Sequence, residues 1–401
     1  MVQEPWNYGT QSRNTSSLCR EADTEAPRFC LIHDLPLVDS PSFVQMRARS
    51  LPARVLSIYG VGSPYVGSAP VLDQSIQSRS IRKVSRTLLR RDWSWEQTVS
   101  YLKVFRRYRP QVVVAEFGGA GVRVREACVR SGIPLITIFH GHDVYSKASL
   151  HDHLDSYSLL FKDAAALVGV SRSMCSHLVS LKAPVSKVHW CACGVDCNAF
   201  HGATPSDAPP DFLSVGRFVE KKAPHFTILA FALVHDLVPE SRLFMIGDGP
   251  LLSWCRDLAQ GLQLDDAVVF LGNCSQSVIQ SRMRSVRAFV QHSIIASDGD
   301  REGTPVAILE ASSSGLPIIS TRHEGIRDVV IEGITGLLVN ERDVEGMSRQ
   351  MIELAKSPDL ARVMGLAGRE YVVNHHSLST SSNRLWSICQ EHITKASHRG
   401  S

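Results

Sequence analysis

Short apolar runs alternate with longer amphipathic stretches through most of this 401-residue chain, and this rhythm constrains the fold more than any other feature. Buried strands of a parallel sheet are typically short runs of Val, Ile, Leu and Phe, and a helical crossover connects each strand to the next. The first round of predicted strands comprises Phe29–His33, Val55–Tyr59, Val112–Glu116, Leu135–Phe139, Ala166–Val170 and Val188–Cys191. The second round comprises Phe212–Val215, Arg242–Ile246, Val268–Leu271, Ala288–Gln291, Pro317–Ser320 and Gly336–Val339. The pattern predicts an α/β protein with two doubly wound, Rossmann-like domains.

A break rich in Pro, Ala and Asp separates the two rounds at Gly202–Asp211. The predicted parts are a flexible tail (1–26), an N-terminal domain (27–203), a C-terminal domain (204–375) and a last segment (376–401) with a helix near Ser379–Thr394 that crosses back to the N-terminal domain. The helices predicted in the second round are Pro224–Leu237, Leu251–Leu262, Val278–Met283, Pro305–Ser314, Ile326–Glu332 and Val344–Lys356. Because parallel α/β domains bind ligands at the carboxyl ends of their strands, the function is expected in a cleft between the two domains.

Composition excludes several classes of protein. A hydrophobic fraction of 44% supports sizeable cores and excludes global disorder. No apolar run approaches the roughly 20 residues that span a bilayer, and the polar start of the chain lacks the apolar segment of a signal peptide. The ten cysteines of such a chain are expected to be reduced thiols, so we expect a cytoplasmic protein.

The net charge of +4 conceals a basic segment, because ten basic and three acidic residues lie between Asp73 and Arg109. Within Ile81–Arg91 the apolar residues are spaced for one helical face and the basic residues lie elsewhere. Such a helix can contact anionic lipid headgroups from the cytoplasmic side, or it can be a solvated helix that packs on the sheet. The sequence leaves both interpretations open.

The segment Ser297–Gly315 (SDGDREGTPVAILEASSSG) contains the densest set of candidate binding residues. Thr304 is a suitable N-cap and Pro305 a suitable first helical residue, so a helix N-terminus with free N–H groups is expected there to bind a phosphate or diphosphate. Gly303 allows close approach of a ligand to the backbone, and Glu302 can accept hydrogen bonds from sugar hydroxyls. Glu310 lies on the same helix. The alternative is an ordinary strand–turn–helix with solvated acids.

A second candidate loop is Leu213–Ala223 (LSVGRFVEKKA), in which Arg217 and Lys222 follow a predicted strand end. A guanidinium and an ammonium group beside a strand end are suited to a diphosphate. The alternative is a solvated basic loop.

Together these two segments resemble the retaining GT-B glycosyltransferases of the family 4 type. VGRFVEKKA is similar to the GR-x-x-x-K loop of that family, and EGTPVAILE matches its E-x7-E motif. The ordered segments that extend the resemblance over roughly residues 110–375 are VSRSMCSHLV with CGVDCNAF, IGDGPLL, FLG and GLPIISTRHEGIRDVVIEGITGLLVNERD. The segment SPSFVQMRARSLPARV (Ser40–Val55) resembles a subgroup that acts in surface-polysaccharide assembly, and it stands where the family usually has a glycine-rich loop.

The resemblance implies a role for each matching residue. Arg217 and Lys222 would bind the diphosphate of a UDP- or GDP-linked sugar, and Glu302 with the Gly303–Pro305 backbone would hold the donor sugar. Glu310 would bind the ribose. One departure is Ala223, which stands where glycine is usual after the lysine.

The sequence FHGHD follows the predicted strand Leu135–Phe139 and supplies further candidates. The resemblance places His140 at the reaction centre, where its side chain would bond a donor hydroxyl or orient the acceptor. Asp143 is expected on the acceptor side, and His142 is expected to be structural.

The sequence also contains two weaker candidates for a metal site. Asp298 and Asp300 form a D-x-D pair, but Arg217, Lys222 and the helix N-terminus already supply positive charge there. Cys191, Cys193 and Cys197 lack the paired spacing of a zinc site. We therefore predict a site without a metal or cofactor, for which the nucleotide sugar is substrate.

The function predicted from these residues is retaining, metal-independent hexosyl transfer to a saccharide or lipid-linked acceptor, without nucleic acid as partner. The alternatives are a sugar-nucleotide epimerase of the same fold and a catalytically silent nucleotide-sugar-binding subunit. An oxidoreductase is least favoured, because AEFGGAG (Ala115–Gly121) is an incomplete dinucleotide motif.

Overall fold

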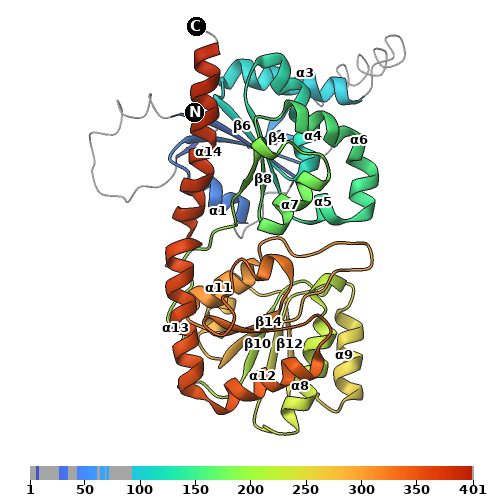
Figure 1. Ribbon diagram of the computed structural model, residues 1–401, viewed down its shortest axis with the longest axis vertical. Helices are drawn as coiled ribbons and strands as arrows, with labels where there is room; N and C mark the ends of the chain where they lie inside the picture. The colour runs from blue at the N-terminus through green and yellow to red at the C-terminus, as the bar shows by residue number, and fades with distance from the viewer. Residues whose placement is uncertain are drawn as a thin grey trace, which may run out of the picture.

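A computed structural model describes residues 6–8, 27–34, 43–60, 64–67, 69–71 and 93–399 of the chain. The ribbon shows two α/β domains stacked along the long axis. Two long helices from the C-terminal end of the chain run beside them on the same side, one along each domain (Figure 1). Each domain contains a mainly parallel sheet with helices on its faces, as the alternation of apolar runs predicts. The basic segment Ile81–Arg91 lies outside the described residues.

The N-terminal sheet has the strand order β5-β4-β3-β2-β6-β7-β8-β9. Its parallel strands are β2 (Arg28–His33), β3 (Arg54–Tyr59), β6 (Val112–Glu116), β7 (Leu135–Phe139), β8 (Ala166–Gly169) and β9 (Val188–Trp190). The antiparallel strands are β1 (Trp6–Tyr8), β4 (Tyr65–Val66) and β5 (Ala69–Pro70), and β1 pairs with β3. The predicted flexible tail is therefore wrong for Trp6–Tyr8, because three residues are enough to add an edge strand that the apolar pattern does not reveal.

The helices of this domain are α1 (Phe43–Ser50), α3 (Trp93–Tyr108), α4 (Gly118–Ser131), α5 (His142–Tyr145), α6 (Lys147–Asp163) and α7 (Arg172–Ser180). A short 3-10 turn, η2 (Val185–Lys187), precedes β9. Strands β6, β7 and β8 are buried along their whole length and form the centre of the core, as expected for mainly apolar strands covered on both faces.

The C-terminal sheet is wholly parallel and has the order β12-β11-β10-β13-β14-β15. Its strands are β10 (Phe212–Val215), β11 (Leu243–Ile246), β12 (Val268–Gly272), β13 (Ala288–Gln291), β14 (Ile318–Thr321) and β15 (Gly336–Val339). The covering helices are α8 (Pro224–His235), α9 (Leu252–Gly261), α10 (Gln276–Met283), α11 (Val306–Ser314) and α12 (Val344–Lys356). The strand order reverses between β10 and β13, the position at which doubly wound sheets bind their ligands.

Two long helices end the chain and join the domains. Helix α13 (Pro358–His375) lies against the C-terminal domain, and α14 (Leu378–Arg399) continues along the N-terminal domain (Figure 1). Leu385, Trp386 and Cys389 of α14 are buried in the N-terminal core, and the ring centroid of Trp386 lies 6.5 Å from that of Phe29. Helix α13 is absent from the sequence-based predictions, whereas α14 is five residues longer at its carboxyl end than predicted.

The predicted helix Ile326–Glu332 is wrong. A 3-10 turn, η4 (Glu324–Ile326), occupies its start, and further turns follow. Tertiary contacts hold this segment out of a helix: the backbone of Gly325 packs against Gly303, and the Asp328 carboxylate accepts the backbone N–H of Arg172 at 2.7 Å. None of the described helices is both long and apolar enough to cross a membrane.

Candidate functional site

The loop after β10 lies at the reversal point of the C-terminal sheet. Gly216, Arg217 and Lys222 line one small cavity together with Gln291, the last residue of β13. The side chain of Arg217 is exposed and has no ion-pair partner among the described residues. The two predicted cations therefore share one site.

Lys222 lies on the 3-10 turn η3 (Glu220–Lys222) and contacts the second predicted motif. Its Nζ atom is 3.1 Å from Oε1 of Glu302 and donates to Oε1 of Gln291 at 3.4 Å. Burial opposes ionisation of Glu302, but the charges of Lys222 and Lys221 outweigh burial and lower the pKa of this carboxyl. The folding of the domain thus joins the loop and the helix mouth into a single charged site.

Helix α11 begins one residue later than predicted. Pro305 is the N-cap and Val306 the first helical residue, so Thr304 does not cap the helix. Instead, the Thr304 hydroxyl donates to the carbonyl of Val170 at 2.6 Å and accepts the N–H of Cys193 at 3.1 Å. Thr304 therefore ties the helix mouth to the N-terminal domain, a contact that local sequence cannot reveal.

Gly303 allows the two domains to approach closely. A Cβ atom at this position would lie 2.6 Å from the His140 carbonyl oxygen and 2.7 Å from Cγ2 of Val170. The His140 backbone and the mouth of α11 consequently face each other across the domain boundary.

Glu310 lies on α11 and is half-buried. Burial raises the pKa of its carboxyl to about 8, and no cation pairs with it among the described residues. A carboxyl group with a raised pKa and no paired cation is a candidate ligand contact, and the predicted contact of Glu310 with a ribose stays a prediction.

The His140 side chain is directed into the N-terminal domain. Its Nε2 atom lies 2.6 Å from Oε2 of Glu116, which is fully buried at the end of β6 and also binds Arg47. Burial opposes protonation of His140, but hydrogen bonds with Cys193 and Glu116 outweigh it and raise the pKa of His140 to about 9. Burial likewise opposes ionisation of Glu116, yet Arg47 and His140 lower its pKa to about 2. A direct bond from this ring to the donor stays a prediction.

Asp143 is occupied by the backbone of its own loop. Its carboxylate accepts N–H groups from Gly118 at 2.9 Å, His140 at 2.9 Å and Gly141 at 3.0 Å. These bonds fix the turn that presents His140, whereas a contact between Asp143 and the acceptor stays a prediction. His142 is mostly exposed, with Nδ1 3.6 Å from Asp300.

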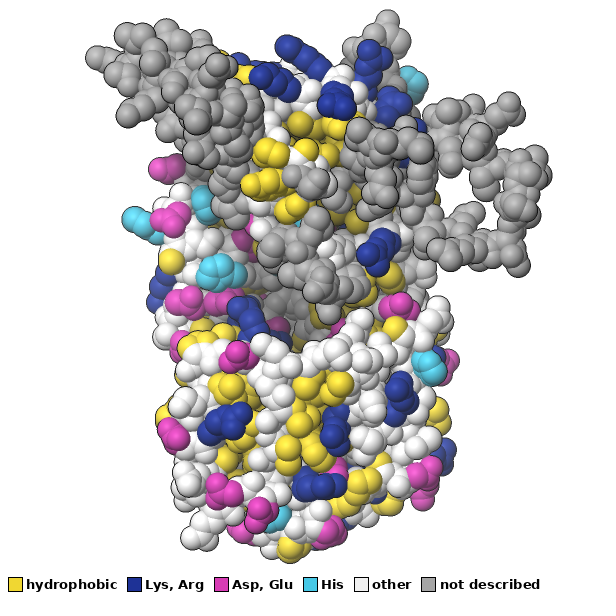
Figure 2. All heavy atoms as spheres, turned by 180° about the vertical axis from the view of Figure 1, so that it is seen from behind, with side chains coloured by type: hydrophobic (Ala, Val, Ile, Leu, Met, Phe, Trp, Pro, Cys, Tyr) yellow, Lys and Arg dark blue, Asp and Glu magenta, His cyan; other side chains and the backbone are white. Residues whose placement is uncertain are grey.

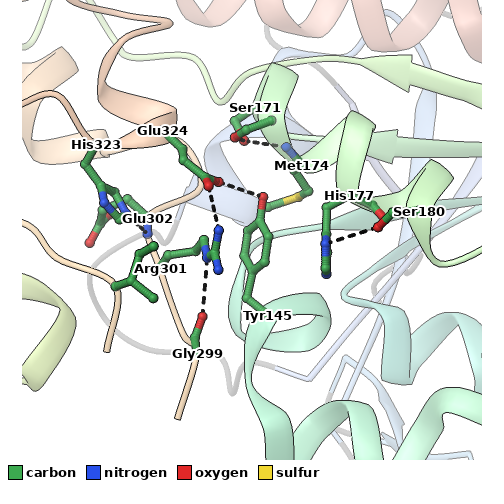
Figure 3. Close-up of polar contacts among 12 residues, drawn as sticks. Tyr145, Ser171, Met174, His177, Ser180, Gly299, Arg301, Glu302, His323 and Glu324 are labelled. Carbon is green, nitrogen blue, oxygen red and sulfur yellow. Dashed lines mark hydrogen bonds and ion pairs between the residues drawn. The ribbon is translucent and has the colours of Figure 1, made fainter. Parts of the chain in front are cut away.

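Tyr145, Arg301 and Glu324 form a cluster across the domain boundary that the sequence-based analysis missed. Figure 3 shows Tyr145 between His177 on one side and Arg301 with Glu324 on the other. The Tyr145 hydroxyl donates to Glu324 at 3.2 Å, Arg301 pairs with Glu324 at 2.5 Å, and the Arg301 guanidinium lies 4.7 Å from the Tyr145 ring centroid. Arg301 and Glu324 lie within segments quoted for the candidate site and the family resemblance, and that position was the available signal.

The carboxylates and thiols of the two candidate metal sites make contacts with other groups of the protein. The Asp300 carboxylate pairs with Lys221 at 3.0 Å, and Asp298 accepts the backbone N–H of Asp300 at 2.9 Å. The Cys191 and Cys197 thiols donate to different carbonyl groups, those of Ser381 at 3.5 Å and Val195 at 3.6 Å.

Comparison with known proteins agrees with this geometry. Residues 199–371 match the family described as "Glycosyl transferases group 1", and residues 58–199 match "Glycosyltransferase Family 4". The chain is 30% identical over 285 residues to the "Putative colanic acid biosynthesis glycosyltransferase WcaL" of Salmonella typhimurium, covering 70% of each protein. It is 29% identical over 289 residues to the "Amylovoran biosynthesis glycosyltransferase AmsK" of Erwinia amylovora, covering 71% of this chain and 70% of AmsK.

Solved structures share the fold. Anabaena HepE in complex with UDP superposes with a TM-score of 0.72 at 13% identity, covering 91% of this chain and 100% of HepE. The chain belongs to the family 4 glycosyltransferases and has their GT-B fold, as the sequence motifs predicted. It is thus a glycosyltransferase enzyme.

Proposed function

We propose that this glycosyltransferase moves a hexose, with retention of anomeric configuration, from a nucleoside diphosphate sugar to a saccharide or lipid-linked acceptor. The observation that carries the proposal is the joining of Lys222, Glu302 and the mouth of α11 at the reversal point of the C-terminal sheet. A helix N-terminus and two cations are suited to the diphosphate, and a buried carboxylate is suited to sugar hydroxyls. A structure of HepE with UDP-glucose supports this class of donor.

The proposed chemistry depends on the leaving group. The donor diphosphate would lie on the N-terminus of α11, with Arg217 and Lys222 stabilising the negative charge that develops as the bond between sugar C1 and the phosphate oxygen breaks and the new glycosidic bond to the acceptor oxygen forms. The acceptor hydroxyl would attack from the same face, and the departing phosphate oxygen would take its proton. No protein side chain is then needed as a base or nucleophile. The His140 carbonyl faces this position across the boundary.

We further propose that the product is part of a cell-surface polysaccharide. The names of WcaL and AmsK, which refer to colanic acid and amylovoran biosynthesis, support this assignment. The two proteins resemble this chain over more than two thirds of their own lengths.

Contact with a membrane that carries the acceptor is a separate part of the proposal. Helix α3 exposes Lys103, Arg106 and Arg107, and Figure 2 shows Lys and Arg side chains at the end of the N-terminal domain remote from the C-terminal domain. Co-sedimentation with vesicles of anionic or neutral lipid tests this part, and equal binding to both would refute an electrostatic contact.

The donor assignment is tested with a panel of UDP-, GDP- and ADP-sugars. A donor at 100 times its dissociation constant is expected to stabilise the protein by about 2.7 kcal/mol in a thermal-shift assay. Transfer is then measured with the stabilising donor and oligosaccharide or lipid-linked acceptors. Conversion of the donor without an acceptor would instead indicate an epimerase, and binding without transfer a silent subunit.

The site residues are tested with Lys222→Met, Glu302→Gln and the double variant, which removes both members of the ion pair. Each is expected to lose transfer by more than about 100-fold, since charge-assisted contacts at a leaving group supply several kcal/mol. Arg349→Met, which removes an exposed cation on α12, is the matched control. Full transfer by the folded double variant would contradict the proposed site.

A further inference from the structure

An almost completely buried ion pair lies beneath the His140 loop. Nη1 of Arg47, on α1, donates to Oε1 of Glu116 at 2.7 Å, and their side chains are 3% and 0% exposed. Glu116 is the last residue of β6, so its carboxylate lies at the carboxyl end of the N-terminal sheet. Arg47 lies in the Ser40–Val55 segment and Glu116 in Ala115–Gly121, but the resemblance assigns a role to neither residue.

Burial gives this ion pair a large desolvation cost, so the pair is not expected to contribute much to the free energy of unfolding. Two charges removed from water lose solvation that their mutual attraction recovers only in part, and apolar residues of similar volume often give equal or greater stability. A buried pair at a strand end beside a reaction centre therefore calls for another explanation than stability.

The pair contacts His140 directly and is connected to the mouth of α11 through Cys193 and Thr304. Through its other oxygen, Glu116 holds Nε2 of His140 at 2.6 Å. Through its other nitrogen, Arg47 donates to Sγ of Cys193 at 3.7 Å, and the Cys193 N–H in turn donates to the Thr304 hydroxyl at 3.1 Å. One ion pair thus links the loop that presents His140 with the loop that leads into α11.

We propose that Arg47 and Glu116 are positioning residues for sugar transfer, which hold His140 and the Cys193–Thr304 contact in register across the cleft. The proposal rests on the proposed function for its catalytic consequence, but the geometric role is independent of it. Neither residue contacts Arg217 or Lys222, so we expect donor affinity to change little when the pair is removed. Transfer does, because a displacement of about 1 Å at a reaction centre can cost about 100-fold in rate.

The principal test is the double variant Arg47→Met with Glu116→Gln, which removes both charges and keeps similar volumes. We expect its melting temperature to stay within about 5 °C of the wild type. We expect kcat to fall about 10- to 100-fold while KM for the donor changes less than about threefold. A folded double variant with wild-type kcat, or one that changes only KM, overturns the proposal.

Glu116→Asp provides a second variant that keeps both charges and shortens the carboxylate arm by one methylene. It is expected to fold and to lower kcat by about tenfold, again without weakening the donor. Wild-type kcat in this variant also overturns the proposal, whatever the stability of the double variant.

Amide hydrogen exchange tests the Cys193–Thr304 contact directly and does not require sugar-transfer activity. The peptide that contains Cys193 is expected to exchange at least about tenfold faster in the double variant. Without Arg47 beside its thiol, Cys193 is expected to hold its N–H less firmly against the Thr304 hydroxyl. Asp211→Asn is the matched control, since it alters a buried carboxylate bound to Arg242 at the opposite end of the C-terminal sheet. Unchanged exchange at Cys193 overturns the positioning role.

A wild-type protein that transfers no sugar refutes the proposed function alone, because the exchange result still decides the geometric role.

Discussion

The Nε2 atom of His323 accepts the backbone N–H of Glu302 at 3.1 Å, and its Nδ1 atom lies 2.6 Å from Oε1 of Glu341. Because a backbone N–H can only donate, Nε2 carries no proton and Nδ1–H donates to Glu341. The ring is fully buried. His323 therefore fixes the backbone from which the Glu302 side chain reaches Lys222.

Replacing His323 tests this support. His323→Ala leaves the Glu302 N–H without its acceptor and is expected to lower kcat/KM by about 10- to 100-fold. His323→Gln can return an amide oxygen to the position of Nε2 and is expected to recover a large part of that loss. Steady-state transfer rates with a saturating acceptor measure both, and equal activity of the Ala and Gln variants would argue against the hydrogen bond.

The raised pKa of Glu310 predicts a pH-dependent stability. Because burial raises the folded-state pKa to about 8, the unfolded chain releases this proton at lower pH than the folded protein, and wild-type stability falls as pH rises from about 4.5 to 8. Glu310→Gln removes this dependence. In the absence of donor, we expect the free energy of unfolding of Glu310→Gln, relative to that of the wild type, to increase by about 1 to 2 kcal/mol from pH 5 to pH 8. This is less than the full pKa shift would give, because solvent screens a half-buried group.

Urea unfolding of both proteins across that pH range provides the measurement. If Glu310 contacts the donor ribose as proposed, the same variant is expected to bind the donor more weakly, since the ribose loses a carboxyl group as hydrogen-bond partner. A stability difference that is constant with pH would show that the carboxyl is already ionised at pH 5.

Ala223, the departure from the family motif, adopts a left-handed conformation with φ of 40°, which a glycine would adopt without strain. This conformation costs a non-glycine residue about 1 to 2 kcal/mol. Ala223→Gly relieves that cost but loses a buried methyl group, worth about 0.8 kcal/mol, so the free energy of unfolding is expected to change by less than about 1 kcal/mol.

Ala223→Val is expected to destabilise the protein by more than about 2 kcal/mol, since a β-branched residue is strained at this φ and the site is fully buried. Denaturant unfolding compares the three proteins. Equal stability of the Val variant and wild type would contradict the left-handed conformation.

Arg217 is expected to act on donor binding alone. Its side chain is exposed, so Arg217→Ala should change stability by less than about 0.5 kcal/mol. It should raise KM for the donor about tenfold or more, because a hydrogen bond to a charged group contributes about 1.5 to 3 kcal/mol. Arg217→Lys keeps the charge and should recover part of the affinity. An unchanged KM for Arg217→Ala would remove this residue from the site.

The sequence by itself determined the local parts of this protein. Runs such as Val112–Glu116 and Leu135–Phe139 predicted their strands to the residue, because a strand buried on both faces is a short and mainly apolar run. The motifs around Lys222 and Glu302 predicted the two segments that the fold brings together at the proposed donor site, because phosphate and sugar binding require particular residue types at short spacings.

Segments governed by distant contacts could not be predicted in this way. The segment Ile326–Glu332 has the composition of a helix, but its contacts with Gly303 and Arg172 prevent one. Thr304 has the character of an N-cap, yet its hydroxyl bonds the other domain.

Only the tertiary structure decided what lies between the motifs. Arg47, Glu116 and His140 come from three elements separated by up to 93 positions, and no local pattern relates them. His323 and Tyr145 likewise acquire their roles from partners elsewhere in the chain. Local sequence fixes which chemistry each segment can perform, whereas the packing of two domains fixes which side chains are buried together, and burial is what turns these side chains into hydrogen-bonded and charged networks.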